Sequence, residues 1–389
     1  MNPADLERLQ ELMRVASRLP VATRAAFMQR AEPRRSDLRD EALSLLSHDD
    51  GRAELIPAQL GEEQFVGPFR LVQRIGEAPP ARLYRATWTD DPQREALVAI
   101  AGPGPAASRI AIALEGQAQR QANFVDPSLA RLSRAGATDD DRLYAAFESP
   151  DCIPLAELGD ALRLPVEERV RLIEEVARAV HRSHAAGIAP LGLLPWSVLG
   201  SWRDDRLETS VLAVDAWPLL ALLEPERRAE SDLLAVLETS APEALRGEER
   251  GVTTDVFALG ALLYESVTGT PPLGLRRLAG QRTLREELRM AAKISPPLAS
   301  DRIARLERAA EPLARARSTT PAALLRELRS GLDSILQRSP SSDASQRPAS
   351  AGDFAAALLS WRSGRGRSLL DAARDIGRKF GFDGSSRAD

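Results

Sequence analysis

The sequence predicts an α+β protein with two lobes, a small β-rich lobe followed by a larger helical lobe, and with a helical extension in front of them. Three observations support this layout. Apolar residues recur at helical spacing near the N-terminus, short strand-like segments separated by Gly, Pro and Asp turns come next, and helical periodicity takes over from residue 155. These changes of pattern place a helical extension, a linker, a β-rich lobe, a helical lobe and a tail at residues 1–50, 51–65, 66–150, 151–363 and 364–389.

The helical extension begins with apolar residues on one face of a helix, among them Leu6, Leu9 and Leu12. Pro20 interrupts this helix, and two further helical segments follow as far as residue 47. The β-rich lobe then contains a helical segment at 108–122 and five segments that read as strands: 69–75, 82–88, 95–101, 129–135 and 142–148.

The helical lobe contains segments with an apolar stripe at 166–187, 253–269, 323–338 and 350–362. The tail carries a further amphipathic segment at 369–382. We expect this tail helix to dock on the last lobe, and a helix that binds a partner or a membrane surface is the alternative.

Composition excludes several classes of function. Of the 389 residues, 43% are hydrophobic and 28% charged, as in soluble globular proteins, and 52 basic against 56 acidic residues give a formal charge of −4. This balance gives no electrostatic reason to expect nucleic-acid binding. The most apolar runs, 211–224 and 256–267, are too short or too interrupted by acids for the ~20 residues that span a bilayer. We therefore expect no transmembrane segment.

The cysteine and histidine counts bear on the compartment and on metal binding. Cys152 is the single cysteine, so no intramolecular disulfide can form, and the N-terminus lacks the pattern of a secretion signal. A cytoplasmic location is expected. The three histidines, His48, His181 and His184, form no metal-binding motif.

Lysine is almost absent from the chain. Lys293 and Lys379 are the only two, and the other fifty of the 52 basic residues are arginines. Arginine offers a planar fork of donors, whereas lysine is a compact point charge. Any chemistry that needs a lysine before residue 293 is therefore excluded.

Several short motifs occur in a familiar order. Ala241-Pro242-Glu243 is followed twelve residues later by Asp255, and Thr268-Gly269-Thr270-Pro271-Pro272 closes the next helix. Together with Arg347 in DASQRPAS, these motifs resemble those of the eukaryotic-type serine/threonine protein kinases of bacteria over about residues 64–362. The resemblance implies a two-lobe protein-kinase-like fold, and the extension is similar to the N-terminal segment that some of these kinases carry.

The matched residues have structural roles in this family. The resemblance implies that Glu243 pairs with Arg347, a directional contact between a guanidinium and a carboxylate that would pin a loop to the helical lobe. Asp255 is expected to accept backbone N–H groups and so to fix the neighbouring loop. None of the three performs phosphoryl transfer.

The catalytic positions depart from the family pattern. In the phosphate-covering turn Gly76 remains, but Ala78 and Ala81 replace the other two glycines. The lysine that pairs with ATP phosphates is replaced by Ala101, the last residue of Val-Ala-Ile-Ala. Gln117 takes the place of the helix glutamate that partners this lysine, and the nearest acid, Glu115, points to another helix face.

The catalytic loop is also changed. After His184-Ala185-Ala186-Gly187-Ile188, the register set by Pro195 and Leu199 puts Gly192 at the catalytic aspartate. Leu194 replaces the lysine that contacts phosphate, and Ser197 replaces the metal-binding asparagine. Glycine has no side chain to accept a proton, so this loss is the most damaging one.

Parts of a nucleotide site could survive. Asp215 stands where the family places its main Mg²⁺ ligand, but one carboxylate is at best part of such a site, and we interpret it as a vestige. Leu83, Ala99 and Leu199 match the residues that enclose adenine, and the backbone of Phe147-Glu148 matches the hinge. If a nucleotide binds, these residues and Gly76 would contact it. The simpler interpretation is that they fill the core between the lobes.

The resemblance and its gaps together predict a pseudokinase that acts as a regulatory scaffold in bacterial signalling. An enzyme with rewired chemistry, using Asp215, Glu115, Arg82 or Arg85, and a switch that binds ATP without catalysis are the alternatives. No cofactor is expected, and any ATP binding is expected to be weak, without strong dependence on Mg²⁺. The expected partners are signalling proteins, with an active kinase of similar fold among the candidates. They would contact the extension, the tail, or residues 215–240, which include Ser231, Thr239 and Ser240.

Overall fold

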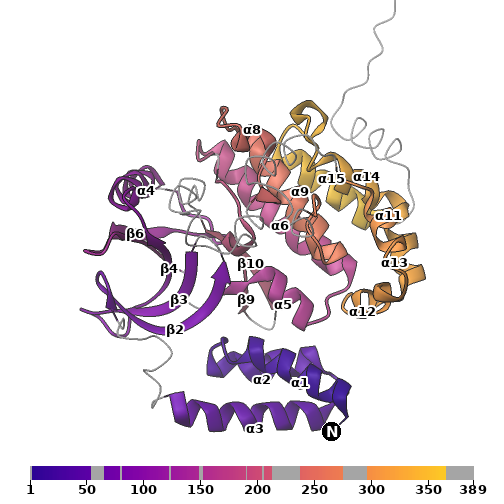
Figure 1. Ribbon diagram of the computed structural model, residues 1–389, viewed down its shortest axis with the longest axis horizontal. Coiled ribbons are helices and arrows are strands. Elements are labelled where there is room, and N and C mark those ends of the chain that lie inside the picture. The colour runs from indigo at the N-terminus through magenta and orange to yellow at the C-terminus, as the bar shows by residue number, and fades with distance from the viewer. Residues whose placement is uncertain are drawn as a thin grey trace, which may run out of the picture.

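The computed structural model describes residues 2–53, 65–78, 81–121, 124–148, 152–189, 191–203, 206–212, 237–274 and 296–364. Figure 1 shows two lobes side by side, with the N-terminal helices packed beneath them. We call residues 2–53 the helical domain, 65–148 the N-lobe and 152–364 the C-lobe. The predicted α+β layout of two lobes with a helical extension is confirmed.

The helical domain consists of α1 (Pro3–Ala16), α2 (Val21–Ala31) and α3 (Ser36–Ala53). Asn2 caps α1 by accepting a hydrogen bond from the backbone N–H of Asp5, and Pro3 occupies the first turn, where no N–H is needed. The three helices bury apolar side chains against one another, including Leu12, Phe27 and Met28, which are all fully buried. These side chains belong to the same hydrophobic cluster as the core of the C-lobe.

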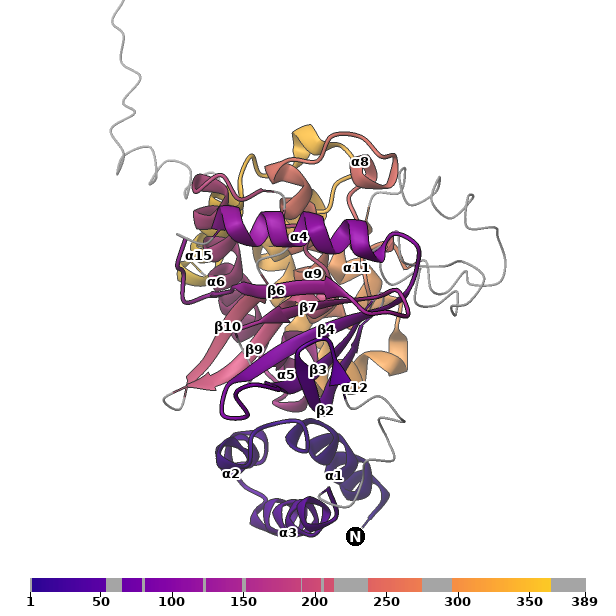
Figure 2. The same cartoon turned by 90° about the vertical axis from the view of Figure 1, so that its left-hand side faces the viewer.

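A six-stranded antiparallel sheet forms the N-lobe, in the order β1-β2-β3-β4-β7-β6. Its strands are β1 (Phe65–Val66), β2 (Phe69–Ala78), β3 (Ala81–Trp88), β4 (Glu95–Pro103), β6 (Leu132–Ala137) and β7 (Arg142–Phe147). Helix α4 (Ala107–Gln121) packs on β6 and β7, as Figure 2 shows. The helix and four of the five predicted strands lie within about three residues of their expected bounds.

A second, four-stranded sheet has the order β5-β10-β9-β8 and connects the lobes. It consists of β5 (Leu129–Ala130), β8 (Ile153–Pro154), β9 (Val198–Arg203) and β10 (Arg206–Leu212). The strand predicted at 129–135 was wrong as one element, because β5 pairs with β10 in this sheet while β6 pairs with β7 in the first. The prediction of helical structure throughout the C-lobe also missed the β9–β10 hairpin.

The C-lobe is built around α6 (Val166–Ala185), which packs against α9 (Val252–Thr268) and α15 (Ala351–Ser363). Ser350 caps α15 by accepting a hydrogen bond from the backbone N–H of Asp353. The remaining α-helices of the described C-lobe are α5 (Leu155–Ala161), α8 (Pro242–Leu245), α11 (Ala299–Ala304), α12 (Ala310–Arg315), α13 (Pro321–Glu327) and α14 (Asp333–Arg338). None of the helices in the described ranges is long and apolar enough to cross a membrane.

The helix predicted over 323–338 is interrupted. Helix α13 ends at Glu327, a π-helical turn spans Leu328–Leu332, and α14 begins at Asp333. Gly331 has φ 114°, a conformation that glycine adopts readily and that breaks the helical ladder. The predicted amphipathic segment in the tail lies outside the described residues.

Candidate functional site

The loop between α6 and β9 is held in place by Asp255 from the first turn of α9. The carboxylate of Asp255 is fully buried. It accepts hydrogen bonds from the backbone N–H groups of Leu191 at 2.9 Å and Gly192 at 3.0 Å. His184 Nε2, at the end of α6, lies 2.8 Å from the same carboxylate. Asp255 therefore fixes the backbone of this loop from the C-lobe side, as the sequence led us to expect.

Gly192 is the residue to which the motif resemblance assigns the catalytic carboxylate. Its φ is 57°, in the left-handed region that favours glycine, and the residue is buried. The loop backbone is thus anchored at this point, but no side chain projects from it. A general base cannot act from this position.

Ser197 is occupied by its own loop. Its hydroxyl accepts a hydrogen bond from Leu194 N at 3.0 Å and donates one to Leu194 O at 2.9 Å, and only 1% of the residue is exposed. These bonds close the short 3-10 turn that spans Pro195–Ser197. The hydroxyl is therefore engaged in closing the turn.

Leu194 and Trp196 join the core of the N-lobe. Both belong to one hydrophobic cluster with Leu83, Ala99 and Leu199, the three residues expected to enclose adenine. Leu194 is 1% exposed and Trp196 2%, and the turn that carries them contacts β2 and β8. The Nε1 of Trp196 is buried without a hydrogen-bond partner in the part of the chain that the structure describes. An indole ring thus packs where the two lobes meet.

The N-lobe residues of the candidate nucleotide site lie together on β2, β3 and β4. Gly76 is the register partner of Leu83, and Leu83 of Ala99. Leu83 and Leu199 have no exposed surface and Ala99 has 4%. Ala101 is 3% exposed and pairs with Ala81, so the position that the resemblance assigns to the lysine is buried and lies beside a small residue on β3.

Glu148 follows β7 at the hinge. Its backbone N–H donates to Arg131 O at 3.1 Å, and its exposed carboxylate accepts a bond from Arg131 Nη2 at 3.0 Å. The N–H group of Glu148 is thus engaged within the N-lobe. Asp215, the candidate Mg²⁺ ligand, and Ser231 lie outside the described residues.

The alternative catalytic residues are scattered. Glu115 is exposed on α4, and Gln117 on the same helix is half-buried. Arg82 is exposed, whereas Arg85 is buried and donates to Gln73 Oε1 and to Arg18 O. The described ranges contain no group of three His, Cys, Asp or Glu side chains that could hold a metal ion.

Glu243 and Arg347 form a bidentate ion pair beside the first turn of α9. Arg347 Nη1 donates to Glu243 Oε1 at 2.6 Å and Nη2 to Oε2 at 2.9 Å. Arg347 also donates to Thr253 O and Ser341 O, and its side chain is fully buried. Burial alone would raise the pKa of Glu243. The hydrogen bonds and charge of Arg347, a backbone hydrogen bond and the hydrogen bond from Thr254 together outweigh burial and hold the pKa below its ordinary value.

Thr239 and Ser240, proposed from the sequence as part of a partner-binding segment, are buried, with 1% and 4% of their surface exposed. Their hydroxyls are therefore not offered to a partner in this conformation. Ala241, the next residue, packs against Phe257 and Ala261 of α9, and the use of residues 215–240 as a partner surface stays a prediction.

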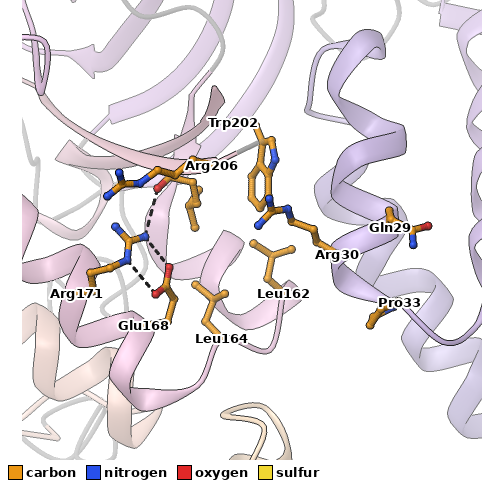
Figure 3. A pocket seen from close by; sticks show the side chains of 10 residues that line it. Gln29, Arg30, Pro33, Leu162, Leu164, Glu168, Arg171, Trp202 and Arg206 are labelled. Carbon is orange, nitrogen blue, oxygen red and sulfur yellow. Dashed lines mark hydrogen bonds and ion pairs between the residues drawn. The ribbon is translucent and has the colours of Figure 1, made fainter. Parts of the chain in front are cut away.

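A cavity of about 590 Å³ lies between the helical domain and the C-lobe. Residues of both parts line it, as Figure 3 shows: Gln29, Arg30, Pro33, Leu162, Leu164, Glu168, Arg171, Trp202, Arg206 and Leu207. The guanidinium of Arg30 lies 4.9 Å from the centre of the Trp202 ring. Arg171 pairs with Glu168 and Glu175, so acids already compensate this charge.

Comparison with solved structures identifies the architecture. The crystal structure of the PknI kinase domain of Mycobacterium tuberculosis matches 76% of this chain and 96% of its own, with a TM-score of 0.50 and 18% identity. The fold is that of a protein kinase domain. No protein-family model matches this kinase-like chain.

Curated relatives agree with the fold. The probable serine/threonine-protein kinase PknB of Lactococcus lactis is 25% identical over 210 residues, which are 54% of this chain and 32% of the relative. The serine/threonine-protein kinase PknJ of Mycobacterium tuberculosis is 24% identical over 287 residues, 74% of this chain and 44% of the relative. The kinase-like chain is thus homologous to bacterial serine/threonine protein kinases, and it spans less than half the length of these relatives.

Two residues with structural roles carry little signal in the sequence. Trp196 packs into the N-lobe core, and its only signal is that it is a large aromatic residue within a loop motif. Arg18 of the helical domain contacts both lobes, and an isolated arginine after a helix gives no periodic signal.

Proposed function

We propose that this kinase-like protein is a pseudokinase, a protein-binding or regulatory scaffold of bacterial signalling with little or no phosphoryl transfer. One observation carries the proposal. The loop of the catalytic centre is anchored by Asp255, yet its anchored residue is Gly192, whose N–H donates to Asp255 at 3.0 Å and which has no side chain. The residue that fixes the loop is therefore present, whereas the loop residue that it fixes has no catalytic side chain.

The energetics of phosphoryl transfer support this proposal. The reaction has little covalent chemistry for the protein to perform, and its acceleration comes from positioning and from electrostatic stabilisation of the phosphoryl group. Ala101 and Gly192 offer no charge, and Ser197 uses its hydroxyl within its own turn. The described residues thus retain none of the three polar groups that this site needs.

The packing between the lobes supports the expectation that nucleotide binding is weak. A pocket for adenine presents apolar surface to solvent when it is empty. Leu83, Ala99 and Leu199 expose at most 4% of their surface. Trp196 and Leu194 share their cluster, so these side chains have protein neighbours instead of a ligand.

The proposed partners are proteins of a signalling pathway, with an active kinase of similar fold among them, and the proposed location is the cytoplasm. A protein that acts by binding other proteins needs a stable surface and does not need a catalytic site. The anchored loop and the Glu243–Arg347 pair both stabilise the C-lobe surface without contributing to catalysis.

A phosphotransfer assay tests the proposal. The full chain would be incubated with radiolabelled ATP, a general protein substrate and either Mg²⁺ or Mn²⁺. We expect no incorporation above that of a heat-denatured sample. Incorporation that Asp215→Ala abolishes would contradict the proposal and favour a rewired enzyme.

A thermal-shift titration with ATP separates the remaining alternative. A ligand that binds only the folded state raises the melting temperature by mass action. We expect no rise with ATP and Mg²⁺. A rise of several degrees without phosphotransfer would identify a switch that binds ATP without catalysis.

A further inference from the structure

One arginine of the helical domain contacts both lobes. Arg18 follows α1, and its Nη1 donates to Ile75 O at 2.9 Å, on β2 of the N-lobe. Its Nη2 forms an ion pair with Glu157 on α5 of the C-lobe, and its Nε donates to Arg14 O at 2.9 Å. The side chain is 15% exposed, so these bonds are largely shielded from water. Arg18 therefore spans the junction between the lobes.

Side chains of the N-lobe also donate hydrogen bonds to the helical domain. Gln73 Nε2 on β2 donates to Ser17 O at 2.6 Å, and Arg85 Nη2 on β3 donates to Arg18 O at 3.0 Å. Arg85 Nη1 also donates to Gln73 Oε1 at 2.9 Å, which orients the amide. The last carbonyl groups of a helix lack partners within the helix. Side chains of the β2–β3 hairpin thus satisfy carbonyl groups at the end of α1.

The C-lobe holds α1 by packing and by a second arginine. Arg8 Nη2 donates to Ala161 O at 2.8 Å, at the end of α5, and Arg8 is only 5% exposed. Leu9 and Leu12 of α1 belong to the same hydrophobic cluster as Leu158 of α5. Figures 1 and 2 both show the helical domain beneath β2 and α5. The domain is therefore attached to each lobe through different residues.

From these contacts we infer that the helical domain is a strap that fixes the β2–β3 hairpin relative to α5. The hairpin and α5 belong to different lobes and would have to separate if the lobes rotated apart. Polar contacts of Arg18, Gln73 and Arg85 join the helical domain to the hairpin and to α5, and Arg8 adds a hydrogen bond to Ala161 at the end of α5. At α2 the helical domain contacts the C-lobe beside the cavity, where Arg30 lies over the Trp202 ring, whereas the residue that contacts both lobes is Arg18, at the end of α1. The inference does not depend on whether the protein is a pseudokinase.

Hydrogen exchange of the full chain tests the strap. Arg18→Gln removes the charge and the fork, while Arg35→Gln is the matched control, because the ion pairs of Arg35 among the described residues are with Asp5 and Asp37, both inside the helical domain. We expect Arg18→Gln to speed exchange in both β2 (69–78) and α5 (155–161) by roughly 5- to 30-fold, the range that one or two kcal/mol gives. Arg35→Gln should leave both peptides unchanged. Faster exchange confined to residues 2–19 would overturn the inference.

A distance measurement supplies an independent readout. With Cys152→Ala as background, spin labels at Asp91→Cys in the N-lobe and Glu311→Cys in the C-lobe, both exposed sites, report the separation of the lobes. The distance distribution should be narrow with Arg18 and should broaden in Arg18→Gln and in Gln73→Ala. Distributions that coincide in all three proteins, each shown by circular dichroism to be folded, would show that the helical domain does not restrain the lobes.

Discussion

The carboxylate of Asp255 accepts a hydrogen bond from the backbone N–H of Gly192 at 3.0 Å. The two residues lie on different elements, α9 and the loop after α6, and both are buried. This contact keeps the loop in position although the residue that it holds has no side chain. The backbone of the loop is therefore fixed at a residue that contributes no side chain.

Removing the Asp255 carboxylate should destabilise the C-lobe. Asp255→Ala leaves the N–H groups of Leu191 and Gly192 buried without acceptors, and each unsatisfied group costs about 1–3 kcal/mol. We expect the free energy of unfolding in urea to fall by about 3–5 kcal/mol. Asp139→Ala, at an exposed turn, should change it by less than about 0.5 kcal/mol. Equal effects of the two substitutions would contradict the anchoring role.

The Glu243–Arg347 pair should give a stability that depends on pH. The folded-state pKa of Glu243 lies below its ordinary value of 4.5. A lowered pKa stabilises the fold fully above the unfolded value, and this stabilisation is lost as the pH falls through the folded value. Compared with Glu243→Gln, the wild type should be more stable by about 3–5 kcal/mol near pH 7, because the variant leaves Arg347 buried without its counter-charge. Below pH 4.5 the difference should shrink.

The control for this pH dependence is Glu248→Gln. Glu248 pairs with Arg246 at the surface, with both side chains about half exposed. Surface pairs of this kind contribute little to stability. Urea unfolding from pH 7 to pH 3.5 should show a small difference for Glu248→Gln throughout, and a pH-independent difference for Glu243→Gln would be evidence against the assigned cause.

Arg347 should not be replaceable by lysine. Its fork donates to both oxygens of Glu243 and to the carbonyl groups of Thr253 and Ser341. Lysine keeps the charge but not the planar geometry. Arg347→Lys should therefore lower the free energy of unfolding by roughly 2–4 kcal/mol, since hydrogen bonds to charged groups are worth about 1.5–3 kcal/mol each. Arg326→Lys, on the exposed face of α13, should leave the free energy of unfolding unchanged in the same experiment.

We expect Trp196 to fill the space between the lobes in which adenine would otherwise bind. Trp196→Ala should cost about 3–5 kcal/mol and leave a space beside Leu83, Ala99 and Leu199. Adenosine should then raise the melting temperature of this variant by a few degrees but leave the wild type unchanged. Trp361→Ala, which opens a cavity at α15, should not respond to adenosine. A response of the wild type would show that the cleft is open without the substitution.

The sequence predicted those elements whose pattern is local. The antiparallel strands of the first sheet, the helix α4 and the long helices α6, α9 and α15 all carry their periodicity in the chain itself. The break at Arg131 has no such local pattern. It exists because β5 pairs with β10 whereas β6 pairs with β7. The β9–β10 hairpin was missed for a related reason, since its apolar end was counted as part of a longer run.

The candidate site was predictable to the extent that motif spacing fixes backbone positions. Gly192, Ser197 and Asp255 were located by spacing alone, and the structure brings Gly192 to Asp255, whereas Ser197 bonds within its own turn. Two things were not accessible in this way. The burial of Trp196 depends on how the lobes meet, and the contacts of Arg18 with Ile75 and Glu157 join residues far apart in the chain.

The parallel pairing of Val211 with Leu129 and of Leu212 with Ala130 joins segments on either side of the hinge into one sheet. A cut in the chain between β7 and β8 would therefore not yield two independent folding units. The two halves should remain associated after cleavage, and separately produced halves should recover native structure only when they are mixed. The two lobes are therefore distinct in shape, but we expect them to fold as one unit.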